Sequence, residues 1–378
     1  MFTLIRNAHV YAPIEKGYLD ILVCNDKIVQ IGDHLMLGLP DMEVIEAEGK
    51  ILLPGFIDQH VHIIGGGGED GFASLIREVQ MTDCVSCGVT SVVGLLGTDH
   101  HAKSVETLVA RTKALREQGM SAWCLTGSYA YPSITLTGSV ARDIAFIDEI
   151  IGVKVAISDH RSSEITPKEL ARLATQARTA GLLAKKPGYV HMHTGSGKKG
   201  YSDVIRVLHA TDIPVSQFRP THFDLNYPGA EEFVAMGGYA DFTTGTDTAA
   251  TARKLKNAMS RMRREQMTLS SDSNGSFPQW DENSNLIGMG IGRMDTLFDT
   301  VRHLITDHDV PINDAITLIT TNVAQALQLY PRKGTIEVGS DADLVMLDRN
   351  LEIDTVMAMG KFAVRDGSLC VRNYYDYQ

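Results

Sequence analysis

The stretch that decides the fold reads Gly55-Phe56-Ile57-Asp58-Gln59-His60-Val61-His62-Ile63. Its apolar residues predict a short buried strand that ends near the two histidines. Side chains two residues apart on a strand project from the same face, so His60 and His62 lie side by side. Two such imidazoles can share one metal ion, or they can be ordinary hydrogen-bonded core residues. The rest of the chain has to decide between these two interpretations.

Seven more strand-like runs follow, and helix-like segments separate them. The runs are Thr90–Gly97, Ala122–Tyr129, Val153–Ser158, Tyr189–His193, Val215–His222, Ala240–Thr244 and Met267–Ser271. The helix-like segments include Val105–Gln118, Pro167–Leu183, Ala249–Arg264 and Met294–Thr306. Eight strand–helix units over about 275 residues predict an α/β fold whose parallel sheet closes into a (β/α)8 TIM barrel. A doubly wound open sheet is the alternative, although it would not need to close at eight strands.

The two ends of the chain have a different pattern, with short strands and turns. The expected strands are Thr3–Val10, Asp20–Cys24, Lys27–Gly32, Gly334–Val338, Ala342–Leu347, Thr355–Met359 and Lys361–Val364. Strand-rich ends around a different middle predict one small β-sandwich domain that both termini build together. We therefore expect residues 1–53 and 332–378 to form this domain, and residues 54–331 to form the barrel.

The composition excludes several classes of protein. The chain has 378 residues and a formal net charge of −11, and a negative surface repels nucleic acid. No cationic and apolar leader opens the chain, and no apolar run reaches the ~18 residues of a membrane span. Five scattered cysteines do not form a disulfide framework. We expect a cytoplasmic protein that binds neither nucleic acid nor a membrane.

Later strands also end at residues that are good metal ligands. Lys154 lies in the fourth strand, His191 in the fifth, His222 ends the sixth and Asp272 follows the eighth. Their spacing is close to whole multiples of the ~30 residues in one barrel unit, so they meet at the same barrel mouth. His193 projects from the same face as His191, so either histidine is a candidate ligand. Together with the first pair, these residues predict a metal centre.

Lys154 needs its own explanation, because its neighbours in sequence are apolar. A bare ammonium group buried beside metal ions would be costly. The lysine either reaches solvent or pairs with a carboxylate, or CO2 converts it to N6-carboxylysine. The resulting carbamate is an anionic ligand that can bridge two cations. Four histidines and one aspartate lack such a bridge, so we predict carboxylation.

Two motifs resemble those of the amidohydrolase superfamily. The entry motif is Pro54–His62, and the closing motif is Gly334–Val345, where the chain re-enters the β-domain. A closer similarity to isoaspartyl (β-aspartyl) dipeptidases spans nearly the whole chain. The segments that carry it are Gly65–Glu69, Thr90–Asp99, Leu125–Gly127, Ile151–Lys154, Ala156–Arg161 and Ser270–Ser276.

The resemblance implies a binuclear zinc hydrolase that cleaves the β-amide bond of isoaspartyl dipeptides. It assigns the first zinc to His60, His62 and Asp272, the second to His191 and His222, and the bridge to carboxylated Lys154 and a hydroxide. The Val190-His191-Met192 stretch matches the family better than the surroundings of His193. It also implies a homo-oligomer.

The resemblance also assigns the remaining site residues. Asp272 serves as general base and acid, and Tyr129 lies over the scissile carbonyl. Glu69 is assigned to bind the free α-amino group of the substrate, and Arg161 and Ser276 are assigned to bind a carboxylate. At Gly67, Gly68 and Thr98, the backbone is expected to approach the substrate closely. The competing interpretations of Glu69 and Arg161 are a solvated loop acid and a structural ion pair.

One departure puts the substrate in question. Isoaspartyl dipeptidases have an arginine three positions after the sixth-strand histidine, and here that residue is Leu225. Arg219 and Arg293 are candidate substitutes. The alternative function is another amidohydrolase reaction on the same metals: a cyclic-amide hydrolase of the dihydroorotase or hydantoinase kind, or an N-acyl-amino-acid hydrolase. A non-catalytic barrel that serves as a scaffold is a third hypothesis, which the complete set of ligands argues against.

Overall fold

A computed structural model describes residues 1–377 of the chain. The eight predicted strands of the middle segment are present and parallel. They are β6 (Phe56–Val61), β7 (Val89–Gly94), β8 (Ser121–Gly127), β9 (Ile150–Ile157), β10 (Tyr189–Thr194), β11 (Phe218–Thr221), β12 (Ala240–Thr243) and β13 (Met267–Ser270). The TIM-barrel prediction is confirmed, and the doubly wound sheet is not observed.

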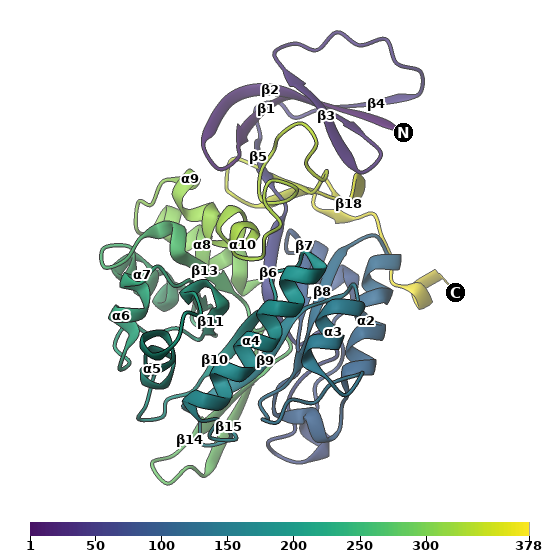
Figure 1. Ribbon diagram of the computed structural model, residues 1–378. Helices are drawn as coiled ribbons and strands as arrows, with labels where there is room; N and C mark the ends of the chain where they lie inside the picture. Colours follow the sequence, from purple (N-terminus) through teal and green to yellow (C-terminus); the bar gives the residue numbers. More distant parts are fainter. Residues whose placement is uncertain (378) are drawn as a thin grey trace.

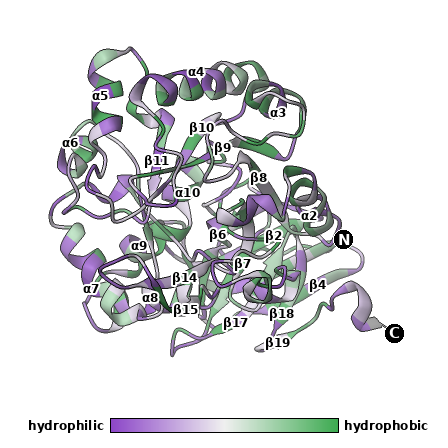
Figure 2. Cartoon of the chain, turned by 90° about the horizontal axis from the view of Figure 1, so that it is seen from below, coloured by the Kyte–Doolittle hydropathy of each residue, from purple (hydrophilic) through white to green (hydrophobic). Residues whose placement is uncertain are grey.

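Helices surround these strands, as Figure 2 shows in a view along the barrel. They are α1 (Met81–Val85), α2 (Val105–Glu117), α3 (Val140–Phe146), α4 (Pro167–Ala184), α5 (Ser202–Ala210), α6 (Ala230–Ala235), α7 (Thr248–Ala258) and α8 (Thr296–Thr306). The short helices α9 (Ile312–Ala315) and α10 (Thr321–Ala326) follow. In α4, Thr166 caps the first turn, and Leu170, Leu173, Ala174 and Ala177 face the strands at helical spacing.

The barrel has two seams at which the regular strand ladder is interrupted. Six strands form one ladder from β11 to β6, whereas β12 and β13 form a ladder with each other. Isolated backbone bonds cross the seams, from Phe223 N to Asp241 O (3.0 Å) and from His62 N to Ser273 O (2.9 Å), and side chains reinforce them. The Asp241 carboxylate on β12 accepts hydrogen bonds from Thr221 on β11 (2.8 Å) and from Gln59 on β6 (2.7 Å). A buried carboxylate therefore holds together strands that the ladder leaves separate.

The chain termini form a second sheet at the other end of the molecule from the hairpin of β14 (Ser276–Trp280) and β15 (Leu286–Ile291) (Figure 1). Its nine strands are β1 (Phe2–Tyr11), β2 (Glu15–Cys24), β3 (Lys27–Gly32), β4 (Met42–Glu46), β5 (Ile51–Pro54), β16 (Leu344–Leu347), β17 (Ile353–Ala358), β18 (Lys361–Arg365) and β19 (Ser368–Leu369). All nine belong to one hydrogen-bonded sheet, not two. Buried residues from both chain ends pack in one apolar cluster, so the sheet encloses its own core.

Two parts of the sequence fold differently from expectation. Gly334–Val338, which we expected to be a strand, is not one. Its Ile336 side chain is fully buried in the terminal core, and the Ile336 carbonyl accepts a hydrogen bond from the Lys16 side chain (3.0 Å) instead of from a neighbouring strand. An unexpected hairpin of β14 (Ser276–Trp280) and β15 (Leu286–Ile291) projects beyond the barrel mouth. The domain boundaries at residues 53/54 and 331/332 stay a prediction.

One buried ion-pair cluster connects the segment after the barrel to the terminal sheet. The Lys333 ammonium lies 2.8 Å from Asp341 and also contacts Asp343, and all three side chains are buried. Burial alone would raise the pKa of Asp341, but the charges of Lys333 and Lys27 lower it below its ordinary value. Within residues 1–377, no helix is long and apolar enough to cross a bilayer.

The Lys333→Met variant is expected to be strongly destabilised. It leaves two buried carboxylates without their cation, which costs about 3–5 kcal/mol in comparable cases. Urea unfolding at equilibrium measures the loss. The matched control is Lys199→Met, because Lys199 and Glu164 form an exposed pair, whose removal changes stability by less than about 1 kcal/mol. Equal stability of the two variants would show that the cluster does not hold the domains together.

Candidate metal centre and active site

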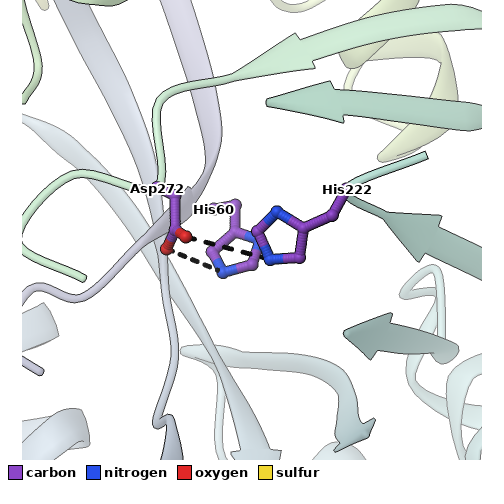
Figure 3. A group of neighbouring side chains, drawn as sticks. All are labelled: His60, His222 and Asp272. Carbon is purple, nitrogen blue, oxygen red and sulfur yellow. Dashed lines mark ion pairs between the residues drawn. The ribbon is translucent and has the colours of Figure 1, made fainter. Parts of the chain in front are cut away.

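The predicted ligands meet at the carboxyl ends of the barrel strands. His60, His222 and Asp272 come from the ends of β6, β11 and β13 and point toward one another (Figure 3). Their candidate ligand atoms all lie within 4.8 Å of one another. Both His222 (φ 56°) and Asp272 (φ 52°) have left-handed backbone conformations, which cost energy in residues other than glycine. Strain of this kind concentrates at functional sites.

Nitrogen and oxygen atoms face each other closely in this group. The Nε2 atoms of His60 and His62 each lie 3.2 Å from Asp272 Oδ1, and His222 Nε2 lies 3.8 Å from Asp272 Oδ2. Burial lowers the pKa of His60 well below its usual range, so this imidazole is neutral. Asp272 Oδ1 is buried and has no hydrogen-bond partner in the described chain. A cation between these atoms would satisfy them.

Lys154 belongs to the same group. Its side chain is fully buried on β9, and Nζ lies 3.3 Å from His60 Nε2. Burial lowers the pKa of this amine to about 7. A neutral amine is the form that reacts with CO2, so the surroundings of Lys154 suit carboxylation. Nothing in them resembles the solvent-reaching lysine that the sequence left open.

The two histidines of β10 occupy different levels. His191 is fully buried, and its Nε2 lies 3.1 Å from Nδ1 of His60, on the side of that ring away from Asp272. His193 lines the cavity and stacks edge-on against His222, with ring centroids 4.7 Å apart. Alternation along a strand cannot separate residues two apart, which is why the sequence left both open. The choice between the two histidines stays a prediction, and the position of His193 on the cavity lining makes it the candidate that we carry forward.

The cavity beside the metal group has a volume of about 270 Å³. Glu69 reaches it from the loop after β6, and its Oε1 accepts bonds from Ser276 (2.8 Å), Thr98 (3.1 Å) and Arg161 (3.3 Å). Its Oε2 is buried and has no hydrogen-bond partner among the described residues. Glu69 is therefore not a solvated loop acid. One of its two carboxylate oxygens is left without a hydrogen-bond donor.

The loop that carries Glu69 depends on its glycines. Gly67 (φ 89°) and Gly68 (φ 100°) both have left-handed backbone conformations. A Cβ atom on Gly67 would also lie 2.5 Å from the carbonyl oxygen of Ser74. Glycine is required at Gly67 for both reasons, and the bare backbone there forms part of the cavity wall.

Tyr129 and Arg161 also line the cavity, together with two residues that the sequence did not single out. Tyr129 donates a 2.6 Å hydrogen bond to His193 Nδ1, because the other ring nitrogen, Nε2, donates to the Asp159 carboxylate (2.9 Å), and Arg161 pairs with Asp159 at 2.9 Å. Burial raises the pKa of the Tyr129 phenol well above its ordinary value, so it stays protonated. The guanidinium of Arg161 lies 5.7 Å from the ring centre of Trp280 on the projecting hairpin. Asp159 follows β9 directly and was visible as a polar residue there, whereas Trp280 had no signal.

The positions proposed for a second arginine lie outside the cavity. Leu225 packs in the hydrophobic core. Arg219 is buried among Tyr189, Tyr239 and backbone, and Arg293 is exposed beside Asp295. Among the residues that line the cavity, Arg161 is therefore the one arginine, and no lysine joins it.

The residues present suit divalent metal ions. Imidazole nitrogen and carboxylate oxygen are ordinary ligands of zinc and of similar transition metals. Asp272 Oδ1, which is buried and has no hydrogen-bond partner among the described residues, is an atom that such a cation would satisfy. His222 Nδ1 bonds to Thr243 Oγ1 (2.7 Å), which orients its ring so that Nε2 faces Asp272.

Comparison with known proteins agrees with this geometry. The model of the amidohydrolase family matches residues 51–363. The crystal structure of a β-aspartyl dipeptidase from Fervidobacterium islandicum AW-1, in complex with a β-Asp-Leu dipeptide, has a TM-score of 0.91 and 36% identity, covering 99% of this chain and 100% of that one. A D-hydantoinase from a Bacillus sp. AR9 has a TM-score of 0.72 at 18% identity, covering 98% and 97%, and so shows likeness of fold alone.

A curated relative matches only locally. A dihydroorotase of Aquifex aeolicus is 42% identical over 62 residues. That match covers 16% of this chain and 14% of the relative.

Zinc is expected to stabilise the protein after treatment with a chelator. An ion at 100 times its dissociation constant adds about 2.7 kcal/mol to the free energy of unfolding. The midpoint of thermal unfolding should therefore rise by several degrees, and His60→Ala and Asp272→Ala should lose this rise. His209→Ala is the control, because His209 is exposed and pairs with Glu232. An equal rise in all three variants would place the zinc elsewhere.

Proposed function

The chain belongs to the amidohydrolase family and is a hydrolase, and from this premise we propose that it cleaves the β-amide bond of isoaspartyl dipeptides. The products are aspartate and a free amino acid. The observation that carries the proposal is the buried, unpartnered Oε2 of Glu69 in the cavity beside the metal group. A buried carboxylate oxygen without a donor favours a ligand that brings a cation, such as the free α-ammonium group of this substrate.

Arg161 and Glu69 together suit an α-amino acid end. Arg161 Nη1 lies 3.3 Å from Glu69 Oε1, so a positive and a negative group stand side by side. The ammonium of the isoaspartyl unit binds Glu69, and its α-carboxylate binds Arg161 with help from the Ser276 hydroxyl. Thr98 holds Glu69 in place through its 3.1 Å bond. Arg161 does this while also paired with Asp159, so its two interpretations are compatible.

The metal centre that we propose holds two divalent ions. His60, His62 and Asp272 bind the first, and His222 and His193 bind the second. Carboxylated Lys154 bridges them. His193 replaces His191 in this proposal because His193 lines the cavity and contacts His222. Such ions lower the pKa of water and polarise a carbonyl oxygen.

The chain's own residues supply the proton transfer and the orientation. Asp272 accepts a proton from the attacking water and passes it to the leaving amine, because its carboxylate lies among the ligands and has two oxygens, Oδ1 facing His60 and His62 and Oδ2 facing His222. Tyr129 turns its hydroxyl proton from His193 Nδ1, which would bind the metal in this proposal, to the carbonyl oxygen as negative charge develops there. Its phenol lies on the cavity wall, and the raised pKa keeps its proton available.

Hydrolysis of cyclic amides or N-acyl amino acids is the alternative on the same metals. It shares the centre, and the absence of a second cavity arginine fits it, because those substrates carry fewer carboxylates. They also lack a free ammonium group, and Glu69 Oε2 would then remain buried without a hydrogen-bond donor. We therefore favour the isoaspartyl dipeptide.

The Glu69→Gln variant is expected to lose activity on isoaspartyl dipeptides. Replacing a charged partner of the ammonium costs about 1.5–3 kcal/mol, so kcat/KM falls roughly 10- to 150-fold. Initial rates on β-Asp-Leu measure the effect. The same rates for a dihydropyrimidine, a hydantoin and N-acetyl-leucine test the alternative.

Glu78→Gln is the matched control, because Glu78 pairs with Arg111 and lies outside the cavity lining. Turnover of a cyclic or N-acyl substrate with none of any isoaspartyl dipeptide would reject the proposed substrate.

Replacement of the two β10 histidines distinguishes the ligand assignments. His193→Ala should retain about one metal ion per chain instead of two, because one ion loses a direct ligand. His191→Ala should retain both. Elemental analysis of the purified variants gives the count, and a reversed result would restore His191 as the ligand.

A further inference from the structure

The Asp241 carboxylate that closes the barrel seam is also connected to a proposed metal ligand. It is fully buried on β12 and accepts hydrogen bonds from Gln59 Nε2 (2.7 Å), Thr221 Oγ1 (2.8 Å), Ser270 Oγ (2.7 Å) and Thr268 Oγ1 (2.9 Å). No lysine or arginine pairs with it among the described residues. Four donors instead stabilise a negative charge at the centre of the barrel.

Thr221 transmits this arrangement to His60. Its Oγ1 lies 2.8 Å from Asp241 Oδ2 and 3.0 Å from His60 Nδ1. A hydroxyl has one proton, and the carboxylate can only accept, so that proton points to Asp241. The lone pairs of Thr221 Oγ1 are then available to accept the Nδ1–H of His60. His191 Nε2, 3.1 Å from the same Nδ1, is a second acceptor within reach.

The placement of the protons in these hydrogen bonds determines which ring nitrogen of His60 is unprotonated. A neutral imidazole carries one proton, so a proton on Nδ1 leaves Nε2 with a lone pair. Nε2 is the atom that faces Asp272 and Lys154. Hydrogen bonds on the remote ring nitrogen fix the tautomer and the orientation of a metal-binding histidine.

We propose that Asp241 and Thr221 are positioning residues, which act through His60 to keep its Nε2 unprotonated and aimed at the metal. The inference rests on the proposed metal centre and goes beyond it, because neither residue touches the substrate or an ion. The same carboxylate closes the barrel and prepares the first ligand. Its structural and functional roles have to be separated by experiment.

The Thr221→Val variant separates them, because valine keeps the shape of threonine and removes the hydroxyl. We expect the affinity for the first zinc, measured by competition with a chelator, to fall about 10- to 100-fold. Thr221→Ser keeps the hydroxyl and should stay within about threefold of the parent. Thr221→Ala serves if the valine variant does not fold.

Ser270→Ala is the matched control. Ser270 also donates to Asp241, but it does not contact His60. This variant should lower the free energy of unfolding of the metal-free protein about as much as Thr221→Val, with zinc affinity unchanged. If Ser270→Ala weakened zinc binding equally, or if Thr221→Val bound zinc as the parent does, the positioning role would be rejected. A parent that binds no zinc would instead reject the proposed metal centre.

The tautomer itself can be observed without metal. In ¹⁵N-histidine spectra of the metal-free parent, with His60 assigned by comparison with His60→Gln, the His60 proton should reside on Nδ1. It should redistribute to Nε2 in Thr221→Val and remain on Nδ1 in Ser270→Ala. A proton on Nε2 in the parent would contradict the proposal.

Discussion

A single buried carboxylate, Asp241, is the constraint on which the arrangement of the barrel depends. The regular backbone ladders connect six strands on one side and two on the other, and few backbone hydrogen bonds cross the two seams between them. The Asp241 side chain adds hydrogen bonds to β6 and β11 across these seams, and it also bonds to its ladder neighbour β13. Burying a charge without a cation is costly, and four donors offset that cost only while the strands keep their register. The strands that carry His60, His222 and Asp272 are therefore placed by the same group.

Much of the architecture could be predicted because it follows local rules. Eight apolar runs at regular spacing predict the strands. Polar residues at the ends of these runs, such as His222, predict a functional site at the mouth of the barrel. The choice between His191 and His193 could not be made this way, since both residues share one face and differ only in depth. Asp241 was hidden for a related reason. It lies inside an apolar run, and its partners come from three other strands, so only the folded structure reveals them.

The departures from expectation are also physical. Gly334–Val338 has the composition of a strand, yet it pairs with no strand and contributes the buried Ile336 to the core of the terminal sheet. The hairpin with Trp280 has little hydrophobic alternation, and its place is set by the cavity it borders. Leu225, which made the substrate uncertain in the sequence, belongs to the packed interior. The charge recognition that we propose in the cavity consequently depends on Glu69 and Arg161.

The junction between β5 and β6 has a mechanical consequence. One residue, Gly55, separates the last strand of the terminal sheet from the strand that carries the two histidines. Its amide bonds to Asp343 at 2.7 Å, and a Cβ atom there would lie 2.9 Å from Asp343 Cβ. This connection leaves no room for the two strands to move independently. A tilt of the terminal sheet would therefore move the imidazoles of His60 and His62. The small domain is therefore rigidly connected to the barrel and is not an independently moving module.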